Sequence, residues 1–166
     1  MVRSLALYVM LALVLVACGG DSSPTESGGP NGPIITANGW MSATINGSPW
    51  SAQFITPVIG QSGHVWTIGG SGANGTTVSF AWMDNGGSTY TVGDPNSVGF
   101  NSVVAIAGQG YQAGPANLGI GGSGTMTITS ITANRITGTF SFTLVRAQGE
   151  PGAGASITNG QFDITY

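Results

Sequence analysis

Hydrophobic and polar residues alternate with a period of two over much of the chain beyond residue 40. The clearest run is RITGTFSFTLV at 135–145. One face of this run consists of Ile136, Gly138, Phe140, Phe142 and Leu144. The other face carries an arginine and hydroxyl side chains, as in a strand that buries one side. We therefore predict a strand here, with Phe140 and Phe142 in the core.

Turn signals separate several of these alternating runs. Asn-Gly supplies the positive φ angles of a tight hairpin turn. The dipeptide occurs at 31–32, 38–39, 46–47, 74–75, 85–86 and 159–160. A further hairpin is predicted between 124–131 and 135–145, whereas 94–123 reads as a strand at 103–107 followed by a long loop. No stretch after residue 18 shows a helical period. We predict an all-β fold, an antiparallel meander of about eight to ten strands forming a sandwich or barrel.

The chain begins with a short apolar segment. Arg3 precedes an uncharged run of thirteen residues, Leu5–Ala17, whereas a membrane-spanning helix needs about 20. This length is typical of a secretory signal peptide. The run ends in LVAC at 15–18, which resembles the bacterial lipobox. The resemblance implies cleavage after residue 17, lipidation of Cys18 and, because Gly19 follows, sorting to the outer membrane.

Composition changes sharply after this segment. Residues 18–37 hold the predicted lipidated cysteine and a Gly/Ser/Pro-rich tether, and 38–166 is predicted to be a single β domain. Cys18 is the only cysteine in the sequence, so the mature domain has no disulfide, catalytic thiol or cysteine-based zinc site.

Charge is scarce. Removing residues 1–17 takes away Arg3 and leaves two arginines against six carboxylates, a net charge of −4 with no lysine. Nucleic acids and anionic lipid headgroups bind to basic patches. We therefore expect no nucleic-acid partner and attachment to the membrane through the lipid on Cys18.

A glycine motif invites comparison with nucleotide-binding loops. Gly70, Gly72 and Gly75 have the spacing G-x-G-x-x-G, which in a dinucleotide site is followed by a helix. Here TTVSFAW follows, and it alternates as a strand does. With 29 glycines in the chain, such a match also arises by chance. We predict a hairpin loop and no cofactor.

Candidate catalytic groups are few. His64 is the only histidine, and GGSGA at 69–73 lacks the final glycine of G-x-S-x-G. Asp84 and Asp94 open DNGG and DPNS, sequences in which an aspartate caps its own turn. We predict no catalytic residues, no metal site and no enzymatic activity.

Four tryptophans leave two interpretations open. Trp50 and Trp82 share faces with apolar residues, which predicts burial. Trp66 lies on the same face as His64 and Ile68, and burial is also its default. The alternative is a platform on which sugar rings stack. The speculative ligand-binding residues are Trp66, His64 and Trp40.

A family resemblance rests on three stretches. INGSPWSA at 45–52, GTMTITSITANRITGTFSFTLV at 124–145 and ITNGQFDITY at 157–166, together with the lipobox, resemble a group of uncharacterised bacterial lipoproteins that carry a domain of unknown function. The resemblance implies an all-β fold and an envelope location. It carries over no catalytic residues.

These observations predict a non-catalytic envelope lipoprotein whose β domain binds a ligand or has a structural role. Its partner would be an envelope polysaccharide or a protein. One alternative is a membrane-anchored hydrolase using two of the carboxylates Asp84, Asp94, Glu150 and Asp163. Another is a small outer-membrane barrel, suggested by the alternating, aromatic C-terminus. A concave pocket lined by His64, a carboxylate or exposed tryptophans would locate the site.

Overall fold

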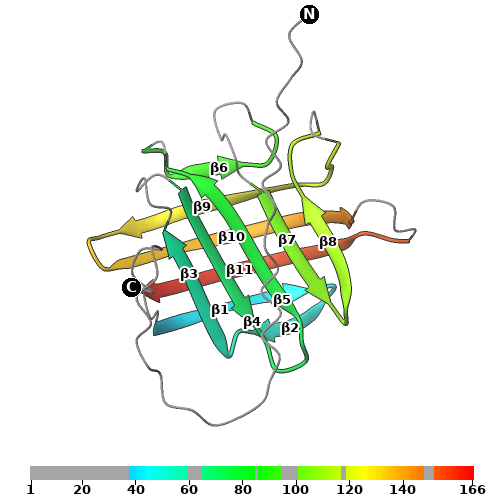
Figure 1. Ribbon diagram of the computed structural model, residues 1–166, viewed down its shortest axis with the longest axis horizontal. Helices are drawn as coiled ribbons and strands as arrows, with labels where there is room; N and C mark the ends of the chain where they lie inside the picture. The colour runs from blue at the N-terminus through cyan, green and yellow to red at the C-terminus, as the bar shows by residue number, and fades with distance from the viewer. Residues whose placement is uncertain (1–37, 60–64, 85, 95–100, 117–118, 148–151) are drawn as a thin grey trace, which may run out of the picture. The chain divides into compact units, whose positions relative to one another are not determined.

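The computed structural model describes residues 38–59, 65–84, 86–94, 101–116, 119–147 and 152–166, all within one compact unit of the chain (Figure 1). Within these ranges no helix is long and apolar enough to cross a membrane. The strands are β1 (Asn38–Ile45), β2 (Ser48–Ser51), β3 (Phe54–Ile59), β4 (Val65–Ser71), β5 (Thr77–Met83), β6 (Thr89–Thr91), β7 (Asn101–Ile106), β8 (Gln109–Ala113), β9 (Ser123–Ile131), β10 (Arg135–Arg146) and β11 (Ala155–Thr165).

The strands form two layers. Sheet A has the order β2-β1-β11-β10-β9-β6, and sheet B has the order β3-β4-β5-β7-β8. Every pairing is antiparallel, and the layers join where the end of β10 pairs with β8. Figure 1 shows the strands of sheet B crossing those of sheet A at a steep angle, as in an orthogonal sandwich.

The predicted all-β, antiparallel fold is confirmed, and the layers form a sandwich that is not closed into a barrel. The described residues form eleven strands, more than the expected eight to ten. The prediction of a loop after 103–107 was wrong at β8. Tyr111 and Ala113 alternate into the core there, and a turn at Ala107-Gly108, with φ of 49° and 78°, joins β7 to β8 without an Asn-Gly signal.

Aromatic side chains fill the space between the two sheets. Phe140 and Phe142 are 3% and 2% exposed, as the alternation in β10 predicts. Phe80 of β5 lies across from them, with ring centroids 5.1 Å from Phe140 and 5.6 Å from Phe162. This cluster links the long strands of sheet A to the centre of sheet B.

The glycine motif lies in the hairpin between β4 and β5, as predicted. The Gly72 N–H donates to the Thr76 carbonyl at 2.8 Å, and Gly75 has a φ of 73°. Residues 77–83 continue directly as β5. A dinucleotide site would need the N-terminus of a helix at this point, so the loop has a structural role.

Asn159-Gly160 does not form a hairpin turn, although the dipeptide favours one. It lies inside β11, where Phe140 pairs with Gly160 but Phe142 pairs with Ile157, so β11 carries a bulge opposite β10. Asn159 takes the positive φ, at 52°. Packing against the flanking strands converts the turn signal into a bulge.

Candidate functional site

Trp66 belongs to the core. Its side chain is 6% exposed, and its ring stacks on Trp82 with centroids 5.9 Å apart and an interplanar angle of 11°. Tyr166 packs edge-on against the same ring at 5.2 Å. The Trp66 Nε1 atom is buried without a hydrogen-bond partner. Because Trp82 and Tyr166 both pack against the indole ring, Trp66 has no open face on which a ligand could stack.

Of the other candidate residues, two tryptophans are buried, one is exposed, and two residues lie outside the described ranges. Trp50 and Trp82 are buried, as predicted, and the Trp50 Nε1–H donates to the Thr76 carbonyl at 3.2 Å. Cys18 and His64 lie outside the described residues, so their predicted roles stay predictions. Trp40 of β1 is the exposed tryptophan of the described chain, at 47%.

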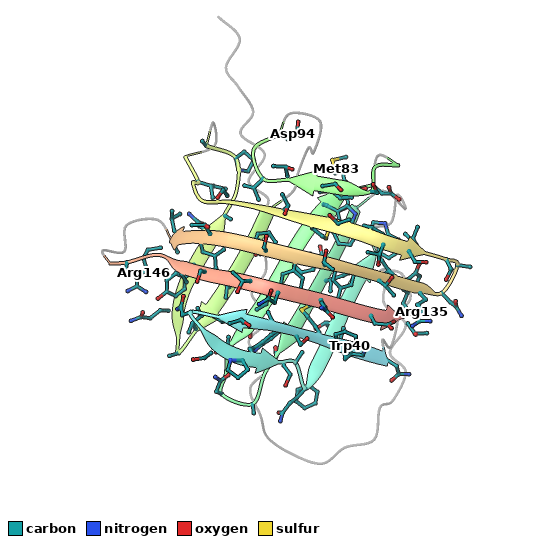
Figure 2. All side chains as sticks on the ribbon, turned by 180° about the vertical axis from the view of Figure 1, so that it is seen from behind. Trp40, Met83, Asp94, Arg135 and Arg146 are labelled. Atoms are coloured by element: carbon teal, nitrogen blue, oxygen red, sulfur yellow. The ribbon has the colours of Figure 1, made fainter. Side chains whose placement is uncertain are left out.

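Trp40 lies on sheet A beside a charged pair. Its Cα partner on the neighbouring strand β11 is Asp163. Arg135, at the start of β10, donates from Nε to Asp163 Oδ1 at 2.8 Å and from Nη2 to Oδ2 at 2.5 Å. Figure 2 shows Trp40 and Arg135 at the same end of sheet A. An aromatic ring and a fixed ion pair therefore lie on adjacent strands.

The ion pair defines the charge state of Asp163. The hydrogen bonds from Arg135 hold the pKa of this carboxyl below its usual range; desolvation opposes them, and the positive charge of the guanidinium adds a smaller lowering effect. The same contact raises the pKa of Arg135. Asp163 stays ionised with both oxygens bonded, a state suited to positioning a partner and poorly suited to donating a proton.

A hollow of about 310 Å³ lies on sheet A near this pair. It is lined by Thr125, Thr139, Ser141, Asn159 and Gln161, together with the buried Phe140 and Gly160. Hydroxyl and amide groups predominate, and no lining residue is charged. Gly160 lies directly against Phe140, and a Cβ there would lie 2.5 Å from the Phe140 ring.

The hollow and Trp40 are both next to strand β11. Gln161 lines the hollow, and Asp163, two residues further along β11, pairs with Trp40. Alternate residues of a strand share a face and are about 7 Å apart. We call the set formed by Trp40, Arg135, Asp163, Gln161 and Thr139 the sheet A strip. It combines an apolar ring, one ion pair and uncharged hydrogen-bonding groups.

A separate cavity of about 140 Å³ lies between β5, β6, β9 and β10. Its lining includes Trp82, Asp84, Tyr90, Ile128, Ile131 and Ile136. Asp84 Oδ1 accepts hydrogen bonds from the Gly86 N–H at 2.9 Å and the Tyr90 hydroxyl at 3.3 Å. The predicted turn-capping role of Asp84 is thus confirmed. Sequence reasoning missed the pairing with Tyr90 and this cavity.

Metal binding finds little support in the described residues. They contain no group of three His, Cys, Asp or Glu side chains that could hold an ion. Of the four carboxylates considered for a hydrolase, Glu150 lies outside the described ranges. Asp163 is held by Arg135, and Asp84 caps its turn.

Comparison with protein families matches residues 37–163 to a domain of unknown function, DUF6252. Neither the curated proteins nor the solved structures contain a match to this chain. The matched range covers most of the chain and includes β1 to β10 in full and β11 as far as Asp163. On this basis, the chain belongs to the DUF6252 family of domains of unknown function.

Proposed function

We propose that this protein is a non-catalytic lipoprotein of the bacterial cell envelope that binds a saccharide chain through the sheet A strip. In this proposal residues 1–17 are the signal peptide, Cys18 carries the lipid, and 18–37 tether the β domain to the outer membrane. The LVAC pattern at 15–18 supports the anchor, and two or more acyl chains suffice for stable attachment.

The choice of a saccharide as the ligand rests on the exposed Trp40 ring beside the Arg135–Asp163 pair. Saccharides present apolar C–H faces and rings of hydroxyl groups. An exposed indole matches the C–H face, and fixed polar groups match the hydroxyls. Arginine has five N–H donors, of which two bond to Asp163. The ion pair orders both side chains before binding, which lowers the entropy cost of binding.

The hollow beside Gln161 extends this surface. Its hydroxyl and amide groups both donate and accept hydrogen bonds, as sugar hydroxyls do. An uncharged lining favours neutral sugar residues at this point, because no fixed charge has to be desolvated. The proposed ligand therefore runs along β11 from Trp40 towards Asn159.

Two engaged carboxylates support a role without catalysis. A glycosidase needs one carboxyl group that gives up a proton and a second that acts as base or nucleophile. Asp163 is kept ionised by Arg135, and Asp84 accepts hydrogen bonds from Gly86 in its own turn and from Tyr90 of β6. Both roles are those of structural and positioning groups.

The test is saccharide binding by the full-length chain in detergent. Envelope polysaccharide fragments are titrated while tryptophan fluorescence is recorded. Trp40→Ala should abolish the saturable change, whereas Phe54→Ala, which removes a 73% exposed aromatic on sheet B, should leave binding intact.

Equal binding by Trp40→Ala and the unmodified protein would refute the sheet A strip as the site. Reproducible hydrolysis of an ester, peptide or glycoside, lost in Asp163→Ala, would instead support the hydrolase alternative.

A further inference from the structure

We infer that the 140 Å³ cavity between β5, β6, β9 and β10 is a second binding site, which takes a small alkylammonium group. It shares no residue with the sheet A strip, so this inference is independent of the proposed saccharide function. Three features carry it: the size of the cavity, its apolar walls, and the carboxylate of Asp84.

The size of the cavity and its apolar lining determine what the uncharged part of the ligand can be. A cavity of about 150 Å³ lined by aliphatic and aromatic side chains can hold benzene, so this one accommodates about six heavy atoms. Ile136 and Tyr90 are 0% and 1% exposed and form buried wall. Ile131 is 49% exposed and gives the cavity an apolar rim. A short alkyl chain fits such a space.

The carboxylate of Asp84 determines which charge the polar end of the ligand should carry. Its Oδ1 atom accepts both of its hydrogen bonds, from Gly86 and Tyr90. Within the described ranges no hydrogen bond or ion pair ends on Oδ2. This oxygen is therefore available to a ligand, and a cationic donor makes the strongest hydrogen bond to a carboxylate.

The surroundings strengthen the preference for a cation. Arg135 is the described cation nearest in sequence to the wall residues Ile131 and Ile136. It is already paired with Asp163. A carboxylate beside apolar walls also interacts more strongly than one in open water. An anion would be repelled, and a neutral alcohol would gain only an ordinary hydrogen bond.

The experiment compares three ligands of similar size on the full-length chain in detergent: n-butylammonium, n-butanol and butyrate. Binding is followed by the NMR signal of the Trp82 indole, assigned with a Trp82→Phe variant. We expect saturable shifts with butylammonium, binding about tenfold or more weaker with butanol, and no shift with butyrate. Butanol binding as tightly as butylammonium, or no Trp82 shift with any ligand, would overturn the proposal.

Two variants make the test specific to Asp84. Asp84→Asn removes the charge but keeps an amide oxygen that can cap the turn, so the fold is retained and the butylammonium preference should disappear. Asp94→Asn removes an equal charge outside the cavity lining and should leave the preference unchanged. An equal loss in both variants would mean that net charge alone attracts the ligand, and would refute the site.

A final arm identifies the source of the ammonium group. Nα-acetyl-lysine N-methylamide presents the same group on a peptide backbone. Binding as tight as that of butylammonium would assign the site to a lysine side chain of a partner. Tighter binding of butylammonium would assign it to a free small amine.

Discussion

Arg135 and Asp163 hold each other across β10 and β11 through two parallel hydrogen bonds, and Asp163 is at the same time the strand partner of Trp40. Asp163 thus connects three neighbouring strands of sheet A: its backbone pairs β11 with β1, and its carboxylate binds Arg135 of β10. A bidentate pair restricts the rotamers of both side chains. The surface next to the exposed indole is therefore ordered before any ligand arrives.

The same pair predicts a pH dependence of stability. The folded-state pKa of Asp163 lies below its ordinary value of 3.8, so its contribution is present above that value and is lost as pH falls through the folded-state pKa. Asp163→Asn should therefore lower stability at about pH 6, and the difference between the two proteins should shrink as the pH falls below 3.8. Urea unfolding of both proteins at each pH measures this. A difference that grows towards low pH would contradict the ion pair.

The packing of the aromatic core predicts that a substitution on the buried face of β10 lowers stability strongly, whereas one on its exposed face does not. Phe140 is 3% exposed and packs on Phe80, so Phe140→Ala should lower the free energy of unfolding by about 3–5 kcal/mol through lost burial and a cavity. Thr143→Ala, on the exposed face of the same strand, should change it by about 0.5 kcal/mol or less. Similar melting temperatures for the two variants would contradict the inward orientation of Phe140.

The bulge in β11 predicts that Gly160 tolerates no side chain. A Cβ there would meet the Phe140 ring and the Phe140 carbonyl oxygen, each at 2.5 Å. Gly160→Ala should cost about 1–3 kcal/mol through overpacking. Asn159→Gly is the matched control, because glycine readily adopts the positive φ of that position. Thermal unfolding that ranks Asn159→Gly as the more damaging change would show that the bulge is not packed in this way.

The lipid anchor gives a prediction outside the described residues. Cys18→Ser should block incorporation of labelled fatty acid and leave an unprocessed precursor, because the lipobox needs the thiol for thioether formation. Metabolic labelling and the electrophoretic mobility of the two proteins measure this. Normal processing of the variant would refute lipidation at Cys18.

Local features of the sequence predicted the strands and several of their connections. The alternation at 135–145 identified the buried face of β10, and Asn46-Gly47 and Asn74-Gly75 marked the hairpins between β1 and β2 and between β4 and β5. Both signals are local. A period of two follows from strand geometry, and a positive φ follows from the residues in the turn itself.

Only the tertiary structure decided which strands became neighbours and which tryptophan remained exposed. Alternation shows that a strand has two faces, but long-range pairing decides whether a face is covered. Trp66 is covered by Trp82 and Tyr166, whereas Trp40 lies on a surface of sheet A that stays open. The bulge at Asn159-Gly160 and the cavity at Asp84 arise for the same reason: they depend on contacts between segments far apart in the chain, which no local pattern records.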